Sequence, residues 1–370
     1  MKILHVDLGN RSYPVIIGRG VMARAGSLLA RRGFDSPPIV ITNNTILRLH
    51  GSTLLRSLEH TFGRTPAIRI GDGERFKNHS TLLRIYEGMF RERADRRSWI
   101  LAFGGGVIGD IAGYAAATFM RGIPYVMAPT TLLAQVDSSI GGKVGINVVQ
   151  GKNLIGAFHQ PSAVLSDTDT LKTLPARELA TGLYEVVKCG AIRSEPLIRY
   201  LERRLPDVLS CLPRVMEHIV LEASRIKAFV VACDEKESGL RMILNYGHTV
   251  GHALEAATDY RRFKHGEAVA WGMIAALEFG RELGLLQTEG AGRLVRLIHR
   301  VGSLPSLRGI SSGDAWKALV RDKKFRSGDV RMVLLRRLGD AEIFTRVDPA
   351  LLRRFLRKFL TRGGSVDGRA

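Results

Sequence analysis

Three histidines lie close together in the chain and could bind a metal ion. His248 and His252 are four positions apart, so they would share one face of a helix, and His265 follows. Neutral imidazole is a common ligand of catalytic divalent ions, which keep a coordination position open for substrate. A purely structural histidine pair is the alternative. Gly247 and Gly251 favour a site, because glycine is a poor helix residue that lets another group approach the backbone closely.

A glycine-rich segment upstream has the pattern of a nucleotide-binding turn. Residues 104–110 satisfy G-x-G-x-x-G, follow the apolar run 98–103 and precede the alanine-rich stretch 111–118. Glycines let the backbone approach a pyrophosphate, and a helix N-terminus favours its negative charge. The acidic ribose contact expected about 20 residues later is not in the sequence. Glu74, which follows the apolar run 67–70, is the alternative ribose contact.

Polar side chains are dense between residues 129 and 153. Gly142-Lys143 and Gly151-Lys152 each place a mobile ammonium group beside a small residue. Such pairs suit a second anionic group, because glycine leaves room for oxyanions that lysine then neutralises. A surface loop without a ligand is the alternative.

The elements that must position these residues alternate along the first half of the chain. A helix is expected around residues 81–90, and strands are expected at residues 15–17, 39–42, 67–70, 98–103 and 124–128. This alternation predicts an α/β fold with a doubly wound, mostly parallel, Rossmann-like sheet. From about residue 178 helical periodicity dominates, and only residues 331–335 resemble a strand. We therefore expect a dinucleotide-binding α/β domain over 1–177, an all-α metal-binding domain over 178–362 and a frayed tail over 363–370.

Composition limits the classes of function. The chain has 370 residues, 45% of them hydrophobic, and a formal net charge of +20. The paired arginines are scattered and have no interleaved aromatic residues, so the charge favours a small anionic substrate over nucleic acid. Cys189, Cys211 and Cys233 form no disulfide framework, which favours the cytoplasm. The sequence shows neither a signal peptide nor the run of about 20 apolar residues that a membrane helix needs.

The ordered motifs of the chain resemble those of the 3-dehydroquinate synthases, in the sugar-phosphate cyclase group, over nearly its whole length. The resemblance rests on Asp72-Gly73-Glu74, residues 104–110, Phe119-Met120-Arg121-Gly122, residues 129–143, residues 184–188, residues 245–252, His265-Gly266-Glu267 and Asp322-Lys323-Lys324.

The resemblance implies a specific metal site and nucleotide site. Its metal ligands would be Glu185, His248 and His265, holding zinc or cobalt, and His252 would instead serve substrate and proton transfer. Asn43 is a further possible ribose contact. The implied NAD contacts are Asp72, Gly73, Glu74, Arg75, Phe76, Lys77, Gly106, Val107, Ile108, Gly109, Asp110, Thr130, Thr131, Lys143, Lys152, Thr170, Leu171, Lys172 and Thr173.

The resemblance also implies substrate and proton-transfer residues. The catalytic groups would be Glu237, His252, Lys143 and Lys188. The substrate contacts would be Arg121, Asp137, Lys143, Asn153, Lys188, Lys227, Arg241, Asn245, His252 and either Lys323 or Lys324, with Lys324 preferred.

The implied activity is conversion of 3-deoxy-D-arabino-heptulosonate 7-phosphate to 3-dehydroquinate and phosphate. It proceeds through transient oxidation by NAD, β-elimination of phosphate, re-reduction, ring opening and aldol closure, and belongs to the shikimate pathway. A homodimer is also implied. The alternatives are a cyclase that makes an inosose or a valiolone, a metal-dependent polyol dehydrogenase, and a basic RNA-binding protein. Lys227, Arg241 and Asn245 favour the carboxylated substrate over the first of these.

Overall fold

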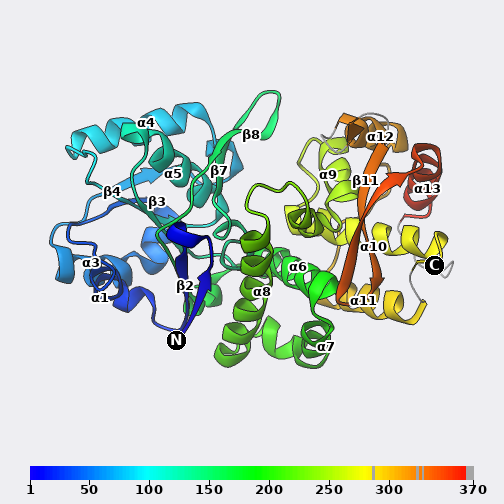
Figure 1. Ribbon diagram of the computed structural model, residues 1–370, viewed down its shortest axis with the longest axis horizontal. Coiled ribbons are helices and arrows are strands. Elements are labelled where there is room, and N and C mark those ends of the chain that lie inside the picture. The colour runs from blue at the N-terminus through cyan, green and yellow to red at the C-terminus, as the bar shows by residue number, and fades with distance from the viewer. Residues whose placement is uncertain (286–287, 322–324, 327–328, 364–370) are drawn as a thin grey trace. The chain divides into compact units, whose positions relative to one another are not determined.

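The computed structural model describes residues 1–285, 288–321, 325–326 and 329–363. It forms two compact units, Met1–Leu179 with Cys211–Lys236, and Ala180–Ser210 with the chain from Glu237 onward (Figure 1). The chain first passes from one unit to the other between Leu179 and Ala180, close to the expected boundary between residues 177 and 178. The helix α8 (Pro213–Cys233) then returns to the first unit, where it packs on β1 and β2. A single boundary does not anticipate this return, because helical periodicity does not reveal which partner a helix packs against.

The first unit contains a seven-stranded sheet. Its strands, in spatial order, are β1 (Lys2–Val6), β2 (Tyr13–Gly18), β9 (Ala163–Asp167), β6 (Tyr125–Pro129), β5 (Ile100–Gly104), β3 (Ile39–Asn43) and β4 (Ala67–Ile70). β1 runs antiparallel to β2, and the other neighbours are parallel. The predicted parallel-rich α/β sheet is confirmed. The sequence analysis did not identify β1 and β9.

Helices cover both faces of this sheet, which is why the inner strands β2, β3, β5, β6 and β9 are fully buried and mostly apolar. Trp99, Leu101 and Phe103 share one core cluster with residues of α1 (Ala25–Ala30) and α3 (Ser52–Phe62). On the other face lie α4 (His79–Arg91) and α5 (Gly106–Thr118) (Figure 1).

Parallel strands place their carboxyl ends at one edge of the sheet, where such folds bind ligands. The segments that follow β4, β5, β6 and β9 at that edge are the predicted nucleotide-contacting stretches. An antiparallel hairpin of β7 (Lys143–Val148) and β8 (Gly151–Phe158) also belongs to this unit (Figure 1). Lys143, Lys152 and Asn153 therefore lie on a hairpin and not in an irregular loop.

The second unit is mainly helical, as predicted. Its helices are α6 (Ala176–Arg193), α7 (Glu195–Leu209), α9 (His248–Ala257), α10 (His265–Glu282), α11 (Thr288–Val301), α12 (Ser312–Arg321) and α13 (Pro349–Thr361). It also has an antiparallel sheet of β10 (Phe325–Arg326), β11 (Asp329–Arg337) and β12 (Asp340–Val347), of which the sequence indicated only the centre of β11. Among the described helices, none has the length and apolar character needed to cross a membrane. Residues 364–370 of the frayed tail expected at 363–370 lie outside the described residues.

Candidate metal centre and nucleotide site

Four potential metal ligands converge in the second unit. Potential ligand atoms of His248, His252 and His265 all lie within 4.8 Å of one another. Glu185 on α6 joins them: its Oε1 lies 3.9 Å from His248 Nε2 and 3.8 Å from His265 Nε2. The structure thus brings together the three ligands that the resemblance implies, and His252 lies beside them.

Close backbone contacts between helices bring these ligands together. A Cβ added at Gly272 of α10 would lie 1.8 Å from the carbonyl oxygen of Gly247, which precedes α9. A Cβ added at Gly266 would lie 2.1 Å from the carbonyl oxygen of Thr181 on α6. Real Cβ atoms do not approach so closely, so glycine is needed at both positions. Gly247 also has a φ of +79°, in the left-handed region.

The donor set fits a divalent ion. Glu185 is fully buried, and within the described part of the chain no hydrogen bond reaches its Oε1. A buried carboxylate oxygen without a partner costs about 1–3 kcal/mol or more, and a coordinated cation would remove that cost. Lys188, one helical turn further along α6, pairs with Oε2 of the same carboxylate.

Glu255 is a candidate residue that the sequence analysis missed. It lies on α9 in the same helix as His248, is 4% exposed, and its Oε2 lies 3.2 Å from His265 Nδ1. His248 Nδ1 has a comparable neighbour, the Tyr246 carbonyl oxygen at 3.2 Å. Outer contacts of this kind fix the ring and direct Nε2 inward. The seven-residue spacing between His248 and Glu255, two helical turns, was the available signal.

Further predicted residues of the second unit lie just before α9. Asn245 Nδ2 donates a 2.8 Å hydrogen bond to Glu237 Oε1, and Arg241 is 2% exposed. Glu237 has a φ of +60°, an uncommon conformation for this residue type. Lys323 and Lys324 lie outside the described residues.

The nucleotide candidates of the first unit gather at the carboxyl edge of the sheet. α5 begins directly after β5, with Gly105 in extended conformation at its N-cap. Lys77 is 4% exposed and its ammonium contacts the carboxylate of Asp110 and the side chain of Asn153. Burial raises the pKa of Asp110, and the Lys77 charge opposes that shift.

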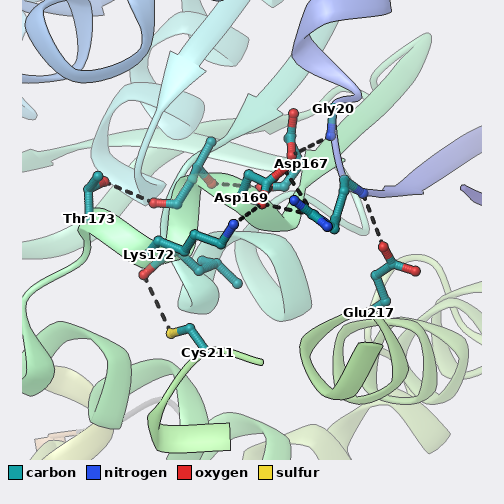
Figure 2. A network of polar contacts seen from close by, with 10 residues as sticks. Gly20, Asp167, Asp169, Lys172, Thr173, Cys211 and Glu217 are labelled. Carbon is teal, nitrogen blue, oxygen red and sulfur yellow. Dashed lines mark hydrogen bonds and ion pairs between the residues drawn. The ribbon is translucent and has the colours of Figure 1, made fainter. Parts of the chain in front are cut away.

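Residues 170–173 belong to a short 3₁₀ helix, Thr168–Thr173, held by a polar network (Figure 2). The Asp167 carboxylate accepts hydrogen bonds from the backbone N–H groups of Gly20, Met22 and Asp169 at 3.1, 2.9 and 3.0 Å. Burial raises the pKa of Asp167. Gln135 Nε2 donates to the Asp167 carbonyl at 2.9 Å, and Thr173 Oγ1 lies 2.8 Å from His50 Nε2.

The sequence did not single out Asp167 or His50. Both lie outside the glycine-rich and lysine-rich motifs, and their partners come from distant parts of the chain. The capping position of Asp167, immediately before the 3₁₀ helix, was the only local signal.

Two predicted substrate contacts of the first unit pair with each other. Lys227 on α8 is 6% exposed, and its ammonium donates to Asp137 Oδ1 and to the Asp137 carbonyl oxygen, both at 2.6 Å. Arg121 is exposed and has a φ of +68°. The structure places Lys143, Asn153 and these residues in the first unit, and places Lys188, Arg241, Asn245 and His252 in the second.

Two family models match consecutive parts of the chain. The first, 3-dehydroquinate synthase N-terminal, matches residues 67–181, and the second, 3-dehydroquinate synthase C-terminal, matches residues 182–325. A 3-dehydroquinate synthase of Symbiobacterium thermophilum is 46% identical over 352 residues, which are 94% of this chain and 98% of that protein.

The chain belongs to the 3-dehydroquinate synthase family. The resemblance is thus confirmed, and the activity is that of a 3-dehydroquinate synthase, a carbon–oxygen lyase acting on a phosphate.

Solved structures of related cyclases share the fold. A 2-deoxy-scyllo-inosose synthase complexed with carbaglucose-6-phosphate, NAD+ and Co2+ matches with a TM-score of 0.87 and 27% identity, over 96% of this chain and all of that one. A 2-epi-5-epi-valiolone synthase from Streptomyces hygroscopicus subsp. jinggangensis 5008, with NAD+ and Zn2+ bound, matches with a TM-score of 0.86 and 28% identity, over 96% and 99% of the two chains. The inosose and valiolone alternatives are therefore more distant than the 3-dehydroquinate synthase family.

Proposed function

We propose that Glu185, His248 and His265 hold the divalent ion, zinc or cobalt, which this chain uses together with NAD in the 3-dehydroquinate synthase reaction. The observation that carries the proposal is the buried Oε1 of Glu185, which lies 3.8–3.9 Å from two imidazole nitrogens. The bound NAD+ and Co2+ or Zn2+ of the two related cyclases support both cofactors.

The chain's own residues would orient the metal ligands and hold the nucleotide-binding segment in place. When bound, NAD supplies reversible hydride acceptance and the divalent ion supplies positive charge for the oxygen of the reacting carbinol. Glu255 and the Tyr246 carbonyl orient the two imidazoles through their Nδ1 atoms. Asp167 and Gln135 hold the Thr168–Thr173 segment in place for the nucleotide.

The proposed substrate is 3-deoxy-D-arabino-heptulosonate 7-phosphate, which carries a carboxylate and a phosphate. The contacts proposed for this substrate, carried over from the family resemblance, are Arg121, Asp137, Lys143, Asn153, Lys188, Lys227, Arg241, Asn245, His252 and Lys324. Guanidinium forks and ammonium groups suit both anionic groups. The related inosose synthase structure holds a sugar phosphate analogue, which supports a sugar phosphate here.

Proton transfer is assigned to Glu237 and His252. Asn245 Nδ2 donates to Glu237 Oε1 at 2.8 Å, so the amide would orient that carboxylate. The His252 ring centroid lies 5.2 Å from that of His248, close to the ligand set without being needed to complete it. An imidazole there can take a proton from the substrate or return one to it.

A homodimer is proposed on an apolar face of the first unit. Leu83 and Phe90 on α4 are 54% and 59% exposed, and Met120 is 38% exposed. Leu83 and Phe90 are two helical turns apart on α4, and the Phe90 ring lies 5.2 Å from that of Phe119, the residue before Met120. A second copy of the chain would cover them. Sedimentation should give a dimer that Phe90→Lys weakens; a monomer at all concentrations would contradict this. Cys189, Cys211 and Cys233 form no disulfide within the described part of the chain, which supports a proposed cytoplasmic location.

Phosphate release tests the proposed reaction most simply. The protein should release phosphate from the heptulosonate phosphate when NAD is present, and release should stop when NAD is removed. Glucose 6-phosphate, the test substrate for the inosose alternative, should give little release. Faster release from glucose 6-phosphate would contradict the assigned substrate.

A further inference from the structure

One residue outside every assigned role, Asn147, makes three hydrogen bonds near the end of β7. Its backbone N–H donates to the Lys77 carbonyl oxygen at 2.8 Å. Its Nδ2 donates to Glu74 Oε1 at 2.7 Å, and its Oδ1 accepts from the backbone N–H of Asn153 at 2.9 Å. The strand register shifts between Ile146 and Val148, so Asn147 leaves the ladder and is available for these bonds.

The three partners belong to two different groups of candidate residues. Glu74 and Lys77 lie in the stretch assigned to the nucleotide, whereas Asn153 is assigned to the substrate. Lys77 closes the connection, because its ammonium contacts both Asp110 and the side chain of Asn153. Nucleotide and substrate contacts of the first unit therefore belong to one hydrogen-bonded network that passes through Asn147.

The hydrogen bond between Asn153 and Asn147 matters because of the backbone conformation of Asn153. Asn153 has a φ of +56°, in the left-handed region, which costs energy even though asparagine tolerates it better than most residues. The bond from its N–H to Asn147 Oδ1 helps to hold that conformation and so directs the Asn153 side chain. The Asn147 amide thus links the Glu74 carboxylate to the Asn153 backbone, whereas Lys77 contacts the Asn153 side chain.

We propose that Asn147 is a positioning residue that couples NAD binding to substrate binding. The inference rests on the proposed function, since it needs Glu74 to contact NAD and Asn153 to contact substrate. A nucleotide that fixes Glu74 also fixes the Asn147 amide, which in turn holds Asn153 ready for the substrate. Coupling of this kind is reciprocal, so substrate tightens NAD binding by the same factor.

Two dissociation constants for NAD measure the coupling. Titration calorimetry on the full-length protein gives the constant alone and with a saturating phosphonate analogue of the substrate, in which CH2 replaces the ester oxygen and phosphate cannot leave. We expect the constant alone to be about ten times the constant with the analogue in the unaltered protein, and we expect this ratio to fall towards one in Asn147→Ala. The exposed Asn10, which lies outside the network, offers the matched control Asn10→Ala, and its ratio should not change.

Asn147→Asp separates the two side-chain bonds and serves if Asn147→Ala does not fold. Its carboxylate still accepts from Asn153 but repels Glu74, so NAD affinity should fall while affinity for the analogue alone stays near that of the unaltered protein. The proposal is overturned if either variant keeps the unaltered ratio, or if Asn147→Asp binds NAD normally. Phosphate release by the unaltered protein separates these results from failure of the proposed function, which would abolish release in every variant.

Discussion

The two units build their candidate functional groups in different ways. In the second unit the metal ligands come from packed helices, and Glu185 and His248 are 0% and 9% exposed. In the first unit the nucleotide candidates follow strand ends, and Asp72 and Glu74 are exposed. The metal ligands depend on helix packing and buried charge, whereas the nucleotide candidates depend on hydrogen bonds that each contribute about 1 kcal/mol. Substitutions should therefore have larger effects among the metal ligands than among the nucleotide candidates.

Removal of a metal ligand should have the largest effect. Glu185→Gln and His248→Ala should lower ion affinity and phosphate release by more than about 100-fold, beyond the loss typical of outer-shell changes. His252→Ala should lose activity yet retain the ion, because His252 is assigned to proton transfer. Metal content after gel filtration checks both; loss of the ion from His252→Ala with retention by His248→Ala would reverse the two roles.

Loss of the outer carboxylate should have an intermediate effect. Glu255→Gln weakens the partner of His265 Nδ1 and should lower ion affinity by about 10- to 100-fold. A competing chelator measures the affinity, and the absorption spectrum of the Co2+-loaded protein reports any change at the ion. Glu282→Gln, an exposed change on α10, is the matched control. Equal ion affinities of Glu255→Gln and Glu282→Gln would show that Glu255 does not support ion binding.

Helix packing should be testable without any ligand. Gly272→Ala places a Cβ against the Gly247 carbonyl and should lower the free energy of unfolding by about 3 kcal/mol. Gly280→Ala is on the same helix, and outside the helix's own backbone no described atom lies within 4 Å of the added Cβ, so it should raise the free energy of unfolding by up to about 1 kcal/mol. Chemical denaturation compares the two; a stabilised Gly272→Ala would show that helix packing there is not tight.

The first unit should show the smallest effect, and it should depend on pH. Burial lowers the pKa of His50, which lies 2.8 Å from Thr173 Oγ1. The unfolded chain then binds a proton more readily, so stability falls as pH drops below about 6.5. His50→Gln should reduce that fall by roughly a few tenths of a kcal/mol, because the half-buried ring is partly screened. Denaturation curves at neutral and mildly acidic pH test this; an unchanged pH dependence would contradict it.

The same contrast explains what the sequence could predict. Residues 104–110 predicted a nucleotide-binding turn because strand, glycines and helix are adjacent in sequence. The metal group could not be derived this way: the spacing of His248 and His252 indicated a pair, and Glu185 lies far upstream. Only the resemblance supplied Glu185, and the structure then places it beside His248 and His265.

Other features depend on contacts that no local pattern encodes. α8 has clear helical periodicity, but its return to the first unit depends on packing against β1 and β2. β1 pairs with β2 at the edge of the sheet, and Asn147 occupies a register shift in a hairpin. Tertiary contacts determine these features, and such contacts outweigh local propensity.

The central claim is that NAD and a divalent ion act together in a reaction that leaves NAD unchanged. The most direct measurement follows phosphate and NADH in one reaction with the heptulosonate phosphate, before and after removal of the ion by a chelator. We expect phosphate release without net NADH, loss of release in the ion-free protein and recovery with Zn2+ or Co2+. NADH formed in proportion to substrate, or undiminished phosphate release without the ion, would contradict it.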